Sequence, residues 1–199
     1  MAIFRPEAKK TGKQFTGICE CAIVGFEDKT GMFDWADLMI EVSVLQKNQE
    51  WPRTFNVSGT LEKDANGKII GGNALTRLYA FFDVIGCKAG LTTSGTWEDE
   101  NGETIRDFVE YLEARFSQDS ANVTSHNYCA YFYKEQPKKI GQKPWVKVMP
   151  MLALNNNEGK AKITDSVEWR KSKGFLKEFD DTAAPVESAD LGLSALDNL

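Results

Sequence analysis

Five segments of the chain alternate hydrophobic and polar side chains with the period of two that is typical of β-strands. They are residues 17–26, 38–45, 51–63, 127–134 and 145–152. The first two flank the turn sequence DKTG, and we expect them to form an antiparallel hairpin. The last two are joined by a long basic connection, EQPKKIGQKP, and predict a second hairpin. Asn66-Gly67 predicts a tight turn after the third strand.

Hydrophobic stripes at helical spacing lie between the third and fourth strands. One stripe predicts a helix over residues 73–85, with Asn73 as its N-cap and Gly86 as the left-handed residue after its last turn. Residues 105–116 carry a second stripe, for which a strand is the alternative. A basic segment, residues 165–177, is a further candidate helix.

The length of 199 residues fits one domain with appendages. Residues 1–15 are basic and lack periodicity, so we expect an N-terminal arm, followed by a folded domain over residues 16–177. Residues 178–199 contain six acidic side chains and no basic one. We expect this segment to be a disordered acidic tail. Residues 130–177 have the opposite character, with a net charge of +7, which is a footprint for a polyanion.

The hydropathy pattern excludes some classes of protein. No apolar run approaches the roughly 20 residues needed to span a bilayer. The first ten residues, MAIFRPEAKK, carry charges where a signal peptide has its apolar region. We therefore expect no membrane association and a cytoplasmic protein, in the host cytoplasm if the chain is viral.

Residues that support catalysis are scarce. The chain has one histidine and no GxxxxGK[ST] phosphate loop, so we expect no enzymatic activity. A metal-dependent nuclease is the catalytic alternative, because a cluster of acids could hold a divalent cation. The cluster consists of Glu98, Asp99, Glu100 and Glu103.

The four cysteines predict no cofactor by themselves, because no CxxC pair is present. We interpret them as reduced thiols in a core. A zinc site is the open alternative, since the chain offers four side chains of suitable type. These are Cys19, Cys21, His126 and Cys129.

Aromatic side chains interleaved with bases suggest a binding function. Single-stranded nucleic acid is bound by cations that neutralise phosphates and by flat rings on which unpaired bases stack. The third strand and the last hairpin supply both kinds of side chain, the hairpin on the face that we infer to be its outer one. The candidate residues are Trp51, Arg53, Phe55, Tyr131, Tyr133, Lys138, Lys139, Lys143, Trp145 and Lys147.

The order of these elements resembles a family, the bacteriophage-encoded single-stranded-DNA-binding proteins with an OB-fold. The resemblance covers about residues 15–155 and includes the basic arm FRPEAKKTGKQF, the hairpin ICECAIVGF to LMIEVSVL, the helix ALTRLYAFFDVIG and the last hairpin. It implies DNA replication or recombination as the setting, and replication or recombination enzymes as partners of the acidic tail. The chain departs from the family in ending LDNL, without a terminal Phe.

We therefore expect a mainly β protein, with an OB-fold-like five-stranded antiparallel barrel, one or two helices and an acidic tail. We expect non-catalytic, sequence-nonspecific binding of single-stranded DNA. A structural or interaction protein of a virus is the alternative, and a metal-dependent nuclease ranks below it. The sequence leaves open the choice between DNA and RNA and whether copies of the chain self-associate.

Overall fold

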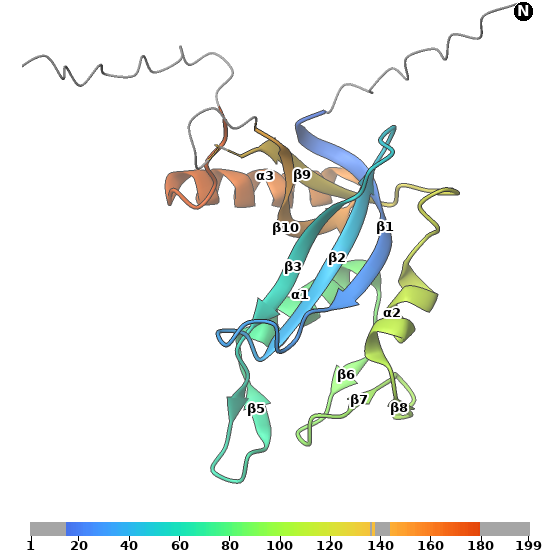
Figure 1. Ribbon diagram of the computed structural model, residues 1–199, viewed down its shortest axis with the longest axis vertical. Coiled ribbons are helices and arrows are strands. Elements are labelled where there is room, and N and C mark those ends of the chain that lie inside the picture. Colours follow the sequence, from blue (N-terminus) through green and yellow to red (C-terminus); the bar gives the residue numbers. More distant parts are fainter. Residues whose placement is uncertain (1–14, 136, 138–143, 180–199) are drawn as a thin grey trace, which may run out of the picture.

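The computed structural model describes residues 15–135, 137 and 144–179. Its centre is a curled antiparallel sheet, shaped like half a barrel, with the strand order β10-β9-β1-β2-β3 (Figure 1). The strands are β1 (Gly17–Asp28), β2 (Leu38–Gln46), β3 (Arg53–Gly59), β9 (Tyr128–Lys134) and β10 (Val146–Leu154). Both predicted hairpins are confirmed, because β1 pairs with β2 and β9 pairs with β10.

The predicted alternation places one face of the sheet in the main hydrophobic core. Ile40, Val42 and Val44 of β2 are at most 1% exposed and pack with Ile23 of β1. Register shifts interrupt the β1–β2 and β9–β10 ladders, and such bulges bend a strand and increase its twist. The sheet curls until its two edge strands, β3 and β10, contact each other. They run in the same direction but form no ladder, so the sheet is not closed by hydrogen bonds as a barrel is.

Helix α1 (Asn73–Ile85) confirms the first predicted helix and packs against β3 and β10. It ends at Gly86, which has the left-handed conformation with φ 75°. The predicted N-cap is wrong, because Gly72 holds that position. Asn73 instead accepts a hydrogen bond from the Thr60 amide at 2.8 Å and so fixes the segment that precedes the helix.

Residues 105–116, for which a strand was the alternative, contain helix α2 (Phe108–Phe116). Its N-cap is Asp107, whose side chain accepts from the Glu110 amide at 2.9 Å. The acidic segment before it forms a small sheet of β6 (Gly90–Leu91), β7 (Trp97–Glu98) and β8 (Thr104–Ile105). Trp97 stacks on Phe108 with a centroid distance of 3.8 Å, which attaches the small sheet to the core.

A two-stranded hairpin of β4 (Glu62–Lys63) and β5 (Ile69–Gly71) contains the predicted Asn66-Gly67 turn. Gly67 has φ 79° and donates to the Asp64 carbonyl at 3.0 Å. This hairpin, the small sheet and α2 lie at one end of the molecule (Figure 1).

Helix α3 (Asn157–Ser172) lies at the opposite end (Figure 1). It begins eight residues before the predicted segment, because Asn156 caps it by accepting from the Gly159 amide at 2.7 Å. Only Gly159, Ile163 and Val167 of this helix are buried, so its periodicity is weak in the sequence. The helix covers the second face of β9 and β10 and forms a separate core cluster with Cys129 and Met149.

The segment after α3 returns to the sheet. Phe179 donates its amide to the Lys134 carbonyl at 2.8 Å, and Glu178 forms an antiparallel bridge with Glu135. Glu178 and Phe179, which we had expected in the tail, therefore contact the folded domain. The N-terminal arm up to residue 14 and residues 180–199 lie outside the described residues. No helix in the described part of the chain is long and apolar enough to cross a membrane.

Candidate nucleic-acid interface

Tyr131 and Tyr133 of β9 lie on the face that α3 covers. Both rings pack against the second core cluster, with a centroid distance of 6.3 Å between them. Burial raises the pKa of both phenols. They lie on the face opposite the main core, as predicted, but α3 covers that face, so both rings are partly buried and not open to solvent. Both rings belong to the packing beneath α3 and contribute little to the exposed surface around it.

The end of α3 is tied to β9 by charged hydrogen bonds. The Tyr131 hydroxyl donates to Glu178, and Lys171 forms an ion pair with Glu178 at 2.7 Å. Burial raises the pKa of Glu178, but the hydrogen bonds from Lys171 and Tyr131 outweigh it and lower that pKa below its ordinary value. The hydrogen bond to Glu178 raises the pKa of Lys171. These contacts fix the chain that leaves α3 against the sheet.

Trp145 and Lys147 lie next to this contact, at the start of β10. Trp145 is 71% exposed, and its carbonyl accepts from the Glu135 amide at 3.3 Å. Lys147 forms an ion pair with Glu135 at 2.6 Å. Because Glu135 also bridges to Glu178, which pairs with Lys171, the start of β10 lies beside the segment that follows α3.

The end of α3 adds aromatic side chains that the sequence analysis did not select. Trp169 is 53% and Phe175 69% exposed, and their ring centroids lie 5.7 Å apart. Gly174 has φ 69°, and the Phe175 amide donates back to the Arg170 carbonyl at 2.9 Å. The next residue, Leu176, is buried. Phe175 is therefore held in solvent by an ordered turn.

The segment that contains Trp169 and Phe175 also carries lysines. Lys171, Lys173 and Lys177 are all exposed, and neither Lys173 nor Lys177 forms an ion pair with another described residue. The signal was present in the sequence as WRKSKGFLK, but only the fold shows that it adjoins Trp145. We call the combined patch the α3-end surface. It consists of Trp145, Lys147, Trp169, Lys171, Lys173, Phe175 and Lys177.

The three candidate residues of the third strand differ in their exposure to solvent. Trp51 precedes β3 and is 74% exposed, which suits a stacking ring. Arg53 is half-buried, and its Nη1 donates to the Pro52 carbonyl at 3.4 Å. Phe55 is 6% exposed and packs edge-to-face on Phe81, so it is not a surface platform. Lys138, Lys139 and Lys143 lie outside the described residues, in the connection that ends next to Trp145.

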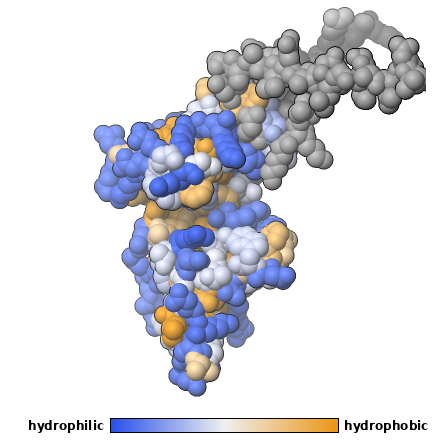
Figure 2. All heavy atoms as spheres, turned by 90° about the vertical axis from the view of Figure 1, so that its left-hand side faces the viewer, coloured by the Kyte–Doolittle hydropathy of each residue, from blue (hydrophilic) through white to orange (hydrophobic). Residues whose placement is uncertain are grey.

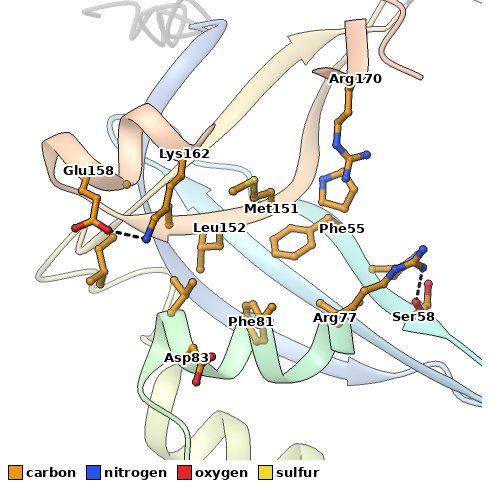
Figure 3. A pocket seen from close by; sticks show the side chains of 18 of the residues that line it. Phe55, Ser58, Arg77, Phe81, Asp83, Met151, Leu152, Glu158, Lys162 and Arg170 are labelled. Carbon is orange, nitrogen blue, oxygen red and sulfur yellow. Dashed lines mark hydrogen bonds and ion pairs between the residues drawn. The ribbon is translucent and has the colours of Figure 1, made fainter. Parts of the chain in front are cut away.

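A pocket of about 790 Å³ opens where β3 and β10 fail to pair. Its walls come from α1, β3, β10 and α3 (Figure 3). Phe55, Phe81 and Leu152 line its apolar part. Arg77 from α1 and Arg170 from α3 lie on either side of Phe55 in this view. Figure 2 shows this side of the molecule, with hydrophobic atoms in a waist between two mostly hydrophilic parts.

The candidate metal ligands do not gather into a site. Among the described residues, no group of three or more His, Cys, Asp or Glu side chains is placed to hold a metal ion. The zinc quartet is therefore not assembled: burial raises the pKa of Cys21 and Cys129, and both are packed as core thiols. In the acidic cluster, Asp99 accepts from the amides of Asn101 and Glu103 and stabilises a turn.

Comparison with protein-family models, with curated protein sequences and with solved structures finds no match to this chain.

Proposed function

We propose that this chain is a non-catalytic protein that binds single-stranded DNA with little sequence preference, in phage DNA replication or recombination. The observation that carries the proposal is the α3-end surface. Its three rings are 53–71% exposed, and exposed lysines stand within a few residues of each ring in the chain. Large exposed rings contribute little to the core. Single-stranded nucleic acid is a ligand that uses both kinds of side chain, because its nucleobases stack on rings and its phosphates bind cations.

The topology supports the same proposal. The five strands of the central sheet follow the chain order β1, β2, β3, β9 and β10, with α1, α2 and two small sheets between β3 and β9, and β1 lies between β2 and β9. This order resembles that of an OB-fold, whose sheet and loops bind oligonucleotides. The two edge strands of the sheet, β3 and β10, approach each other without pairing, and a pocket lies at that position.

The binding mechanism follows from the placement of the side chains. Bases stack on Trp145, Trp169 and Phe175, at roughly 1–3 kcal/mol for each base. Lys147, Lys173 and Lys177 neutralise phosphates and release counterions, together with the three lysines of the connection between β9 and β10. Trp51 and Arg53, at the start of β3, are further candidate contacts. Stacking and charge neutralisation use no base-specific contact, which accounts for the absence of sequence preference.

An anisotropy titration with fluorescently labelled oligo-dT tests the proposal. We expect binding that weakens steeply between 50 and 200 mM salt and that unlabelled duplex competes for poorly. Trp169→Ala should weaken binding about tenfold. Ile70→Ala is the control, since Ile70 is an exposed hydrophobic side chain (66%) in β5, at the other end of the molecule (Figure 1).

Three results would count against the proposal. They are no binding at 50 mM salt, equal affinity for duplex and single strand, and an equal effect of Trp169→Ala and Ile70→Ala. Equal effects would remove the α3-end surface from the mechanism even if DNA binds elsewhere.

A further inference from the structure

We propose that the pocket between α1, β3, β10 and α3 binds one nucleotide. Its phosphate lies between Arg77 and Arg170, and its base lies against the apolar wall. This inference takes its class of ligand from the proposed function. The pocket volume of about 790 Å³ lies within the range of roughly 300–1,000 Å³ that is usual for small-molecule sites.

The two arginines of the pocket, Arg77 and Arg170, lie away from its acidic side chains, Asp83 and Glu158 (Figure 3). Arg77 donates through Nη1 to the Ser58 carbonyl at 2.8 Å, which leaves its other donors available and fixes its position. The Nε atom of Arg170 is buried without a hydrogen-bond partner. A buried, unpaired guanidinium donor is costly, and two guanidinium groups at one site favour an oxyanion that can accept paired hydrogen bonds.

The rest of the pocket offers no competing cation. Lys162, at the other end, forms an ion pair with Glu158 at 2.7 Å (Figure 3). Between the two ends the wall is apolar, with Phe55, Met151 and Leu152. An anion with a flat apolar body therefore fits better than a free inorganic anion, because the body removes the wall from water.

The free edge of β3 supplies polar groups along the same wall. The Gly59 carbonyl accepts from Asp37 on the β2 side, so the backbone groups of Asn56 and Ser58 point to the opposite side, which the pocket occupies. The Ser58 carbonyl is taken by Arg77. No backbone partner in the described part of the chain is found for the Asn56 amide and carbonyl. These two groups can donate to and accept from the edge of a base.

The pocket also adjoins the α3-end surface. Trp169 and Arg170 are consecutive residues, and the first is an exposed ring of that surface whereas the second lines the pocket. A strand that stacks on Trp169 can therefore place a neighbouring nucleotide at Arg170. The chemistry is the same for a nucleotide within a strand and for a free mononucleotide, and the experiment separates these two sources.

Methyl NMR of the full chain with ¹³C-methyl methionine tests the inference. Met151 lines the pocket, and Met32, which is 60% exposed in the loop between β1 and β2, is an internal control. We expect dTMP to shift the Met151 signal and not that of Met32. Thymidine and inorganic phosphate, at the same concentration, should shift it much less because each supplies half of the contacts. Oligo-dT should shift it as well.

Arg170→Gln should weaken the dTMP effect about tenfold without lowering the melting temperature, since Nε has no protein partner to lose. Lys173→Gln is the matched control, because Lys173 is a cation of the α3-end surface and does not line the pocket. Equal effects of the two variants would overturn the assignment of the phosphate to Arg170.

The outcomes separate this inference from the proposed function. If oligo-dT binds but neither it nor dTMP shifts Met151, the pocket is not a nucleotide site and the proposed function stands. If dTMP shifts Met151 but oligo-dT does not bind, the pocket serves a free nucleotide and the proposed function fails. A shift by oligo-dT alone assigns the site to a strand. A shift by the acidic peptide of residues 186–199, and by no nucleotide, would overturn the inference.

Discussion

The aromatic residues of this surface fall into two groups: rings that pack in a core cluster, and rings that lie outside it and are exposed. Tyr131 contacts the second core cluster and donates to Glu178, whereas Trp145 is 71% exposed. The two residues were equivalent candidates in the sequence, because both stand on the same face of an alternating hairpin. Burial by α3 separates them.

Tyr131→Ala and Trp145→Ala should therefore fail in different ways. We expect Tyr131→Ala to destabilise the fold by about 3 kcal/mol, as for a packed aromatic ring, which is measured by urea denaturation. Trp145→Ala should leave stability unchanged and weaken binding of oligo-dT by roughly 1–3 kcal/mol. A Tyr131→Ala protein of normal stability with weakened binding would restore Tyr131 as a stacking platform.

Glu178 gives the surface around α3 a pH dependence. Its carboxylate accepts from Lys171 and Tyr131, and its pKa is lowered from the ordinary value of 4.5. A lowered pKa in the folded state contributes stability that is present above pH 4.5 and is lost as the pH falls through the folded-state pKa. Glu178→Gln should therefore lower the melting temperature at pH 7.

The difference in melting temperature between the wild type and Glu178→Gln should shrink as the pH falls below 4.5 and disappear once it is below the lowered folded-state pKa. Glu158→Gln is the control, since its pair with Lys162 is exposed at the other end of α3. Exposed pairs contribute little, so this variant should change the melting temperature less at every pH. A Glu178→Gln difference that persists at low pH would show that the hydrogen bonds, and not the charge, matter.

Helix α3 is the element on which the candidate site depends, and its first turn has no spare room. A Cβ on Gly159 would lie 2.0 Å from the Leu154 carbonyl oxygen, a backbone atom at the end of β10. The close approach lets the helix begin directly after the strand and cover β9. Because α3 begins at the end of β10, its last residues, among them Trp169 and Arg170, lie away from that end of the strand.

Gly159→Ala should therefore cost stability, although alanine is ordinarily the better helix former. We expect a destabilisation of about 1–3 kcal/mol from the steric overlap, measured by urea denaturation. Gly90→Ala is the matched control, because the nearest atom to its added Cβ is 4.0 Å away. A stability of Gly159→Ala equal to that of the wild type would mean that the helix can move away from β10 without cost.

The whole molecule combines a basic end with an acidic C-terminal segment. Residues 178–199 carry six acids and no base, and Phe179 leaves the fold beside β9, close to the α3-end surface. A tethered acidic segment has a high effective concentration there. By charge alone it is a competitor of nucleic acid.

Truncation after Phe179 should leave the melting temperature unchanged, since it keeps the contacts of Glu178 and Phe179 with β9. It should strengthen binding of oligo-dT, most of all at low salt where screening is weakest. Truncation after Lys177 should in addition lower the melting temperature, because it removes those contacts. Equal affinities of the full and the Phe179-truncated chain at every salt concentration would remove the competitor role.

The sequence by itself determined the elements whose pattern is local. Alternation over residues 38–45 places Ile40, Val42 and Val44 on one face in any sheet, and the stripe of 73–85 with Gly86 specifies a helix and its end. Strong periodicity of this kind depends only on neighbouring residues, so it is visible without the fold. The basic character of residues 130–177 is likewise a property of the sequence alone.

Only the tertiary structure decided which faces remain exposed. Helix α3 has few buried positions, so its periodicity gave no warning that it covers Tyr131 and Tyr133. The pocket beside Arg170 exists because β3 and β10, distant in the sequence, approach without pairing. Exposure depends on contacts between elements that are far apart in the chain, and the order of residues within one element does not contain that information.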